Sequence, residues 1–189
     1  MNEEHFEERF EQLSWSGGSI VGQRFERCTF VRCDLSGADL GKCKFIECVF
    51  EGCDLSMVKV SGTALQNVQF KACRMMGVDL SACSEMLFET GFEECTVDHS
   101  VFAKRHMPRT RFVRCSLKGA AFDMAQLEGS VFDRCDLLDA VFDRTDLRKV
   151  DLSTAYNFRI DPDSNKVRGA RFSMEGALTL LDKYGLRIE

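Results

Sequence analysis

The sequence has few of the residues, and none of the short motifs, on which enzyme sites commonly depend. It holds only 3 histidines, and it contains no GxxxxGK[ST] phosphate loop, no HExxH zinc motif and no Gly-rich loop between a strand and a helix. The run Asp98-His99-Ser100 cannot act as a catalytic triad, because neighbours on an extended segment point in different directions. Carboxylates are numerous but spread along the chain. We therefore expect no enzymatic activity, no catalytic residue and no cofactor.

Long apolar runs are absent as well. No stretch approaches 18 consecutive apolar residues, which excludes a membrane-spanning helix and a membrane partner. The N-terminus, MNEEHFEERFEQ, is acidic and lacks a basic region followed by an apolar run, so neither a signal peptide nor a transit peptide is predicted. The length of 189 residues fits one domain. We expect a cytoplasmic protein.

What the sequence does contain is a repeat of five residues. From Phe10 to Leu80 every fifth residue is apolar, and after a step of seven to Leu87 the period resumes and continues to Leu152. We call these apolar positions the centres. A period of five matches neither the 3.6 of a helix face nor the 2 of a strand. With 44% of the chain hydrophobic, so long a succession is not chance, and it indicates a repeat architecture.

The cysteines obey the same register. Nine of the 10 cysteines stand two residues before a centre, a position that elsewhere holds alanine, serine, threonine or valine and that we call the small position. The tenth, Cys83, continues the same register into the step between Leu80 and Leu87. This placement favours small apolar residues that fill a core over disulfides or redox chemistry. There is no CxxC, and the spacing lacks zinc-finger form. We predict no metal site, with a metal held by Cys43, Cys48 and Cys53 as the alternative.

The repeat consensus is a small residue, then Asp or Asn, then Leu or Phe, then two variable residues. It occurs here as CDLSG, ADLGK, CDLSM, VDLSA, CDLLD, TDLRK and VDLST, and over roughly residues 8 to 155 it resembles the pentapeptide-repeat family. The resemblance implies an all-β solenoid, a right-handed quadrilateral β-helix with four repeats in each turn. Twenty residues then complete a turn, so that Cys33 stacks under Cys53 and Cys73. We expect about seven turns over roughly 35 Å.

Residues 1–155 are predicted to form this β-helix, with an N-terminal cap over about residues 1–22 that includes Trp15. Two irregularities interrupt the repeat. The first is a phase break at residues 81–88, where two extra residues are inserted.

The second irregularity is a predicted bulge at residues 103–110. Arg105 stands there in a small position, and because a buried unpaired guanidinium is costly we expect its side chain to swing outward. Pro108 also removes a backbone donor in the same repeat. A protruding contact site and an ordinary tolerated bulge both fit this pattern.

Residues 156–189 are predicted to be a linker, a short C-terminal α-helix and a tail. Ser173 can cap the helix and Gly185 can end it. Apolar residues remain after one stripe of this helix has covered the last turn, which favours a two-fold homodimer through the C-terminus. The candidate interface residues are Leu178, Leu180, Leu181, Tyr184, Leu186 and Ile188.

The formal net charge of −5 conceals segments of opposite sign. Residues 104–119 hold six bases and no acid, whereas residues 120–155 hold eight acids and four bases, a net charge of −4. The second segment spans roughly 9 Å of the coil axis, or about one net charge per 2 Å, against about one per 1.7 Å in duplex DNA. This density predicts imitation of DNA, although a solvated acidic surface is the plainer alternative.

Not all of these acids are free for binding. Asp136, Asp146 and Asp151 directly precede a centre, where an aspartate can accept hydrogen bonds from its own backbone. The binding candidates are the other five, namely Asp123, Glu128, Asp133, Asp139 and Asp143. Direct nucleic-acid binding is not expected, because no aromatic platform accompanies the basic segment.

Two further stretches and the single phase break resemble one group within the family. The stretches are RFERCTFVRCDLSGADLGKCKFIECVFEGCDLS and ARFSMEGALTLLDKYGL. This group comprises the Qnr, MfpA and McbG proteins, which protect topoisomerases, and the likeness is greatest to the albicidin-resistance proteins such as AlbG. The resemblance implies a DNA-mimicking homodimer that binds DNA gyrase, with topoisomerase IV as a further target, and protects it from topoisomerase poisons.

Enzyme-specific contacts are expected from the two irregularities, at Glu85, Phe88, Arg105 and Arg109. The long projecting loops of some Qnr proteins are absent, which favours a peptide or albicidin-like toxin over a quinolone as the agent countered. The alternative is an interaction or scaffold module for a partner other than gyrase. The sequence leaves open which toxin is countered and what the basic segment does.

Overall fold

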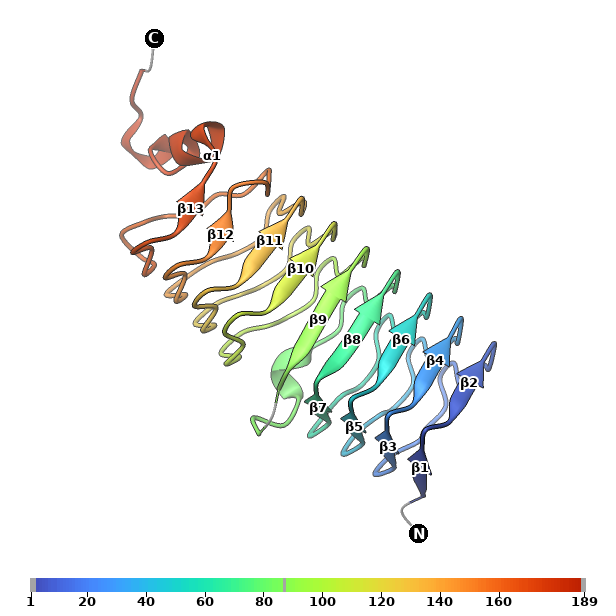
Figure 1. Ribbon diagram of the computed structural model, residues 1–189. Helices are drawn as coiled ribbons and strands as arrows, with labels where there is room; N and C mark the ends of the chain where they lie inside the picture. The colour runs from blue at the N-terminus through green and yellow to red at the C-terminus, as the bar shows by residue number, and fades with distance from the viewer. Residues whose placement is uncertain (1–2, 87, 188–189) are drawn as a thin grey trace.

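The five-residue repeat forms one side of a four-sided coil. The computed structural model describes residues 3–86 and 88–187, and Figure 1 shows the coil running from the N-terminus in blue to a short helix in red. On each side the small position and the centre point inward. The residue two places after the centre adopts a left-handed conformation, as at Lys104 (φ 62°) and Gly119 (φ 63°), and turns the chain onto the next side.

Successive turns pair as parallel strands. The bounds of the strands in the four-stranded sheet are β1 Glu4–Phe6, β3 Arg24–Glu26, β5 Lys44–Ile46 and β7 Ala64–Gln66. Those in the nine-stranded sheet are β2 Arg9–Glu11, β4 Thr29–Val31, β6 Val49–Glu51, β8 Val68–Lys71, β9 Thr90–Glu93, β10 Arg111–Val113, β11 Val131–Asp133, β12 Asp151–Leu152 and β13 Arg171–Phe172. Pairing partners such as Phe112 and Phe132 lie one turn of 20 residues apart. The predicted right-handed quadrilateral β-helix is confirmed.

We name the four sides in chain order. The sheet side carries the nine-stranded sheet. The aspartate side carries the bridges that link Ser14, Asp34, Asp54, Arg74, Thr96, Ser116, Asp136 and Tyr156. The valine side carries the bridges from Asp79 through Val101 and Ala121 to Val141. The break side carries β1, β3, β5 and β7 and, past the phase break, the bridges from His106 to Lys166. Because there are four sides, the aspartate side and the break side face in opposite directions.

Aromatic side chains fill the coil in continuous stacks. Phe112 lies parallel to Phe92 at a centroid distance of 4.9 Å and to Phe132 at 4.8 Å. Stacked and edge-on aromatic pairs contribute about 0.5–1.5 kcal/mol each beyond the burial of their area. The stack therefore couples each turn to the next and stabilises the whole rod.

The cysteines occupy the interior, as predicted. All ten are free and buried, and the bridging registers place Cys33, Cys53, Cys73, Cys95, Cys115 and Cys135 in one column. The thiols are also hydrogen-bond donors, for example from Cys53 Sγ to the Phe30 carbonyl oxygen at 3.4 Å. Burial raises the pKa of Cys48 to about 11 and that of Cys83 to about 12. A thiolate is the reactive form, so these two thiols are poor nucleophiles, and burial shields all ten from reagents in the folded protein.

We therefore predict that the folded protein shows almost no reaction with the thiol reagent DTNB, whereas the denatured chain reacts at all ten cysteines. The absorbance of released thionitrobenzoate measures the number of thiols modified. In partial denaturant the labelling rate should follow global unfolding measured by circular dichroism. Rapid labelling of even one cysteine in native buffer would contradict the assigned interior position.

Two residues are inserted into the repeat between β8 and β9. Strand partners are 22 residues apart across the insertion, as for Phe70 and Phe92, and the spacing returns to 20 afterwards. The break begins with the 3-10 turn η1 (Leu80–Ala82). Figure 1 shows this turn and the following loop, in green, protruding beside β7 and β9.

The predicted bulge at residues 103–110 is wrong. The bridges on either side of it, Val101 with Ala121 and His106 with Gln126, keep the regular register. Arg105 does not swing outward either, since its side chain is only 4% exposed. Its guanidinium donates to the carbonyl oxygens of Cys83 at 2.7 Å and Ser84 at 2.8 Å, and to that of Ser81 at 3.3 Å.

The phase break explains this burial. The inserted loop leaves carbonyl groups without ladder partners, and a buried carbonyl needs a donor. The Arg105 guanidinium supplies several donors at once, and it also lies 5.0 Å from the ring centroid of Phe88. Arg105 therefore holds the loop of residues 83–89, which we call the break loop, against the coil.

The N-terminal segment is a turn of the coil. β1 and β2 pair in register with β3 and β4, so the segment predicted as a cap forms the first turn itself. His5 takes a centre position and stacks on Phe25 at 4.7 Å, while Trp15 packs against the core. The edge is rimmed by glutamates, which discourage pairing with another strand.

The coil also extends past residue 155, which corrects the predicted linker. Tyr156 bridges Asp136, Lys166 bridges Asp146, and β13 pairs with β12. Asn165 replaces the small residue of this last turn, and its Oδ1 accepts a hydrogen bond from the Thr145 backbone nitrogen at 2.8 Å. The coil therefore ends at β13 and includes one more turn than predicted.

The C-terminal helix caps the last turn. Ser173 is its N-cap, as predicted, and the Ser173 Oγ accepts from the Gly176 nitrogen at 2.9 Å. The helix α1 spans Met174–Thr179, and the 3-10 turn η2 (Asp182–Tyr184) ends at Gly185 with φ 61°. A Cβ at Gly176 would lie 2.6 Å from the Phe158 ring, so glycine permits close packing on the coil. No helix among the described residues is long and apolar enough to cross a membrane.

Candidate functional site

The five acidic candidates do not share one face. The 20-residue turn places Asp123 and Asp143 on the valine side, one above the other, because Ala121 pairs with Val141. Glu128 lies on the break side, Asp133 on the sheet side in β11, and Asp139 at a corner of the aspartate side. A partner that contacts one side of the rod meets at most two of them.

Most of these carboxylates are also neutralised by neighbours. Glu128 contacts Lys149 Nζ at 3.0 Å and Arg148 at 3.2 Å, and the hydrogen bond from Lys149 lowers the pKa of Glu128. Asp143 pairs with the adjacent Arg144 at 2.8 Å. Among the described residues, only Asp123 and Asp139 of the five have no ion pair within 4.0 Å.

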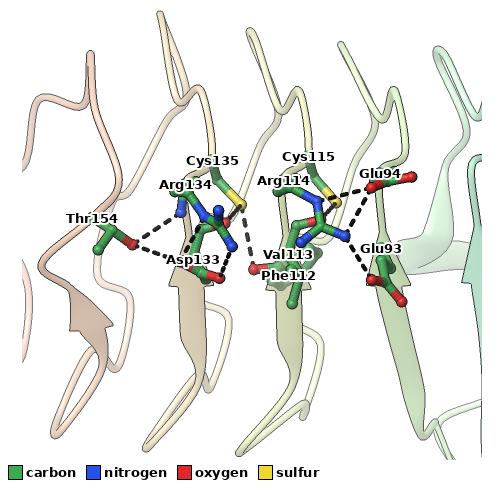
Figure 2. A network of polar contacts seen from close by, with 10 residues as sticks. All are labelled: Glu93, Glu94, Phe112, Val113, Arg114, Cys115, Asp133, Arg134, Cys135 and Thr154. Atoms are coloured by element: carbon green, nitrogen blue, oxygen red, sulfur yellow. Dashed lines mark hydrogen bonds and ion pairs between the residues drawn. The ribbon is translucent and has the colours of Figure 1, made fainter.

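Figure 2 shows this neutralisation on the sheet side. Arg114 reaches back along the rod to Glu93 and Glu94, both at 2.8 Å, and Arg134 binds Asp133 at 3.2 Å. The hydrogen bond from Arg134 lowers the pKa of Asp133. Arg114 belongs to the basic segment of residues 104–119. A second base of that segment, Lys118, is also paired, at 3.4 Å from Asp136. No single side reaches the charge density of DNA that the segment total suggested.

One side of the rod is nevertheless acidic along its length. The outward carboxylates of the aspartate side are Asp34, Asp54, Asp98, Asp136 and Asp139, against two bases, Arg74 and Lys118. Its other outward positions are mostly serine, threonine and glycine. The eight bridge positions from Ser14 to Tyr156 span roughly 34 Å at the usual strand spacing.

Local hydrogen bonds fix these carboxylates in place. Asp34 Oδ1 accepts from the Ser36 nitrogen at 3.0 Å and the Ser36 hydroxyl at 2.6 Å, which lowers the pKa of Asp34. Asp98 Oδ1 accepts from the Ser116 hydroxyl at 2.6 Å and the Lys118 nitrogen at 2.9 Å. Asp54 and Asp136 likewise accept from the nitrogens of Ser56 and Leu138. One oxygen of each of these four carboxylates is thereby held, and their negative charges are presented at fixed positions.

The four candidates at the irregularities divide into two kinds. Glu85 and Arg109 are exposed, whereas Phe88 and Arg105 are 7% and 4% exposed. The buried pair shapes the break loop from inside, so only Glu85 and Arg109 are available to a partner. Among the described residues of the loop, the most exposed apolar residue is Met86, at 73%, which was not among the sequence-based candidates.

The candidates for a dimer interface lie at the C-terminal end. Tyr184 and Leu186 are 53% and 59% exposed, and Leu178 and Leu181 are 40% and 36% exposed. Leu180 packs against the core instead. The sixth candidate, Ile188, lies outside the described residues. The exposed set forms an apolar surface on and after α1.

The aspartate side escaped the sequence analysis because charge was summed along the chain. Writing the sequence in rows of twenty, with a shift of two at the phase break, places Asp34 above Asp54 and Asp98 close to Ser116. The same arrangement would have continued the repeat to Val167 and Phe172. Both the acidic row and the additional turn are therefore visible in the sequence once it is aligned turn by turn.

The fold and these sides define a protein with a parallel β-helical rod and side-chain surfaces suited to binding. Residues 23–102 match the family model described as pentapeptide repeat region, and residues 125–156 match that described as pentapeptide repeats (8 copies). The chain belongs to the pentapeptide-repeat family. No curated protein matches the chain.

Two solved structures are similar over most of their length. A trypsin-treated variant of QnrB1, a plasmid-mediated fluoroquinolone resistance protein, has a TM-score of 0.59 at 20% identity, covering 100% of this chain and 99% of that one. HetL, involved in heterocyst differentiation regulation in the cyanobacterium Nostoc sp., has a TM-score of 0.55 at 16% identity, covering 91% and 86%. At these identities both show the fold alone. The expected likeness to albicidin-resistance proteins stays a prediction.

Proposed function

We propose that the protein binds DNA gyrase, with topoisomerase IV as a further target, and protects it from topoisomerase-poisoning toxins or antibiotics. It acts by binding and not by catalysis. The observation that carries the proposal is the aspartate side, a row of fixed carboxylates along a rigid rod. Such a row complements a basic surface built to hold a DNA backbone.

Further support comes from the sequence stretches that resemble the topoisomerase-protecting group and from the fold shared with a fluoroquinolone resistance protein. The partner surface is proposed to be the DNA-binding groove of the enzyme, which would hold the aspartate side. Contacts at Glu85 and Arg109, on the opposite side, would come from a second surface of the enzyme. The apolar surface around Leu178, Tyr184 and Leu186 is proposed to join two copies into a homodimer that acts in the cytoplasm.

A supercoiling assay tests the function directly. At micromolar concentration the purified protein is expected to inhibit gyrase supercoiling in the absence of drug, because it competes with DNA. At lower concentration it is expected to reduce the cleaved DNA that accumulates with a gyrase poison such as albicidin or ciprofloxacin. Agarose gels measure both products. If supercoiling and cleavage are unchanged up to about 50 μM protein, the proposal fails. A Kd above that concentration corresponds to a binding free energy weaker than roughly −6 kcal/mol.

A second function has its own support. The exposed Met86 and the break loop protrude from an otherwise smooth rod, and the same fold serves HetL, a protein involved in differentiation regulation. An interaction module for a partner other than gyrase would use this protrusion. Affinity purification from bacterial lysate separates the two functions, because gyrase subunits should be enriched only under the first.

A further inference from the structure

The break loop and the turn after it enclose a cleft on the break side. Its volume is about 430 Å³. The lining residues are Glu85, Phe88, Glu89, Thr90, His106, Pro108, Arg109 and Thr110. Clefts of roughly 300–1,000 Å³ accommodate small molecules.

The two walls of the cleft carry opposite charges. Glu85 and Glu89 belong to the break loop, and Arg109 belongs to the next turn, and all three are exposed. Among the described residues none of the three has an ion pair within 4.0 Å, in contrast to the paired glutamates and arginines of the sheet side. The walls therefore offer an anionic and a cationic contact that the protein does not use internally.

The floor of the cleft is rigid and contains an unused polar atom. Phe88, Thr90 and Thr110 are each at most 8% exposed. Thr110 Oγ1 donates to the Met107 carbonyl oxygen at 2.8 Å, and Arg105 holds Phe88 from inside. The Thr90 hydroxyl is buried and has no hydrogen-bond partner among the described residues. A buried hydroxyl without a partner is rare in native proteins and points to a ligand or water.

We infer that this cleft binds a small dipolar ligand of the amino-acid or short-peptide class. Its ammonium group would contact Glu85 and Glu89, its carboxylate would contact Arg109, and its apolar side chain would rest against Phe88 and Pro108. A free peptide carries an ammonium group at one end and a carboxylate at the other, so it can contact both walls at once. The site is distinct from the aspartate side.

The two sites also face in opposite directions. The aspartate side and the break side are opposite sides of the coil, so a partner that covers the first leaves the second accessible. A partner confined to the aspartate side therefore does not compete with a ligand in the cleft, whereas an enzyme contact at Glu85 and Arg109 would compete with it. The inference stands whether or not gyrase is the partner.

Titration followed by NMR tests the inference, with the free dipeptide alanyl-phenylalanine as the probe. We expect saturable shifts of the amides of Phe88, Glu89, Thr90, His106 and Arg109, with a Kd of about 1 mM or below. The same dipeptide blocked by N-acetyl and C-amide groups should bind at least tenfold more weakly, because it carries neither terminal charge.

Substitutions of the charged wall residues test whether they contact the ligand. Glu89→Gln and Arg109→Gln should each weaken binding of the free dipeptide by about fivefold or more, whereas the exposed controls Glu51→Gln and Arg32→Gln should not. Equal binding of the blocked dipeptide would indicate recognition of an internal peptide segment and would overturn the inference. Shifts that fail to saturate by about 10 mM, or that lie outside the cleft, would overturn it as well.

Discussion

Replacing Arg105 with alanine is expected to lower the free energy of unfolding by about 3 kcal/mol. The substitution removes the donors to the carbonyl oxygens of Ser81, Cys83 and Ser84. Leaving a buried acceptor unsatisfied costs about 1–3 kcal/mol each, and water entering the vacated space recovers part of this. Thermal and urea unfolding followed by circular dichroism measure the change, which should appear as a lower denaturant midpoint.

Two further variants separate the polar role of Arg105 from its bulk. Arg105→Met keeps most of the aliphatic stem but none of the donors, so it should be nearly as destabilising as alanine. Arg109→Ala changes an exposed side chain four residues on and should stay within about 0.5 kcal/mol of the wild type. If Arg105→Met restores wild-type stability, packing and not hydrogen bonding accounts for the position, and the assigned role is wrong.

The sequence was sufficient to predict the scaffold because the repeat is redundant. Every turn repeats the same choice of small residue and centre, so errors at single positions do not change the register. The burial of the cysteines and the capping of α1 by Ser173 followed from local chemistry alone. The last turn was missed because its first sides depart from the repeat. The expected centres are Asn157 and Pro162, and the buried residues are instead Phe158, one position later, and Ile160, which fills the small position 20 residues after Ala140.

The direction of Arg105 was not predictable in the same way. Its burial depends on carbonyl groups freed by an insertion about twenty residues earlier, and no local pattern reports them. The acidic candidates lie on different sides for a related reason, since a charge total along the chain ignores which side each residue faces. The net charge of a segment also does not report which acids are paired, as Asp143 is with Arg144.

Neutralising the aspartate side is expected to abolish most of the effect on gyrase. We predict that the combined substitution of Asp34, Asp54, Asp98 and Asp136 by asparagine weakens inhibition of supercoiling at least tenfold, about 1.4 kcal/mol. Asparagine retains the Oδ1 acceptor that bonds the Ser36 nitrogen and its equivalents. Only the charge changes, so the coil should unfold at a similar temperature.

A matched control distinguishes a particular side from net charge. Substituting Asp123, Asp133 and Asp143 by asparagine and Glu128 by glutamine removes four charges as well, but from the other three sides. If the aspartate side occupies the basic groove, this variant should keep nearly full inhibition, because a rigid rod presents one side at a time. Equal loss in both variants would show that net charge alone matters, and loss only in the control would restore the original candidates. Since both proteins carry the same formal charge, any difference between them must arise from where the 20-residue turn places each carboxylate.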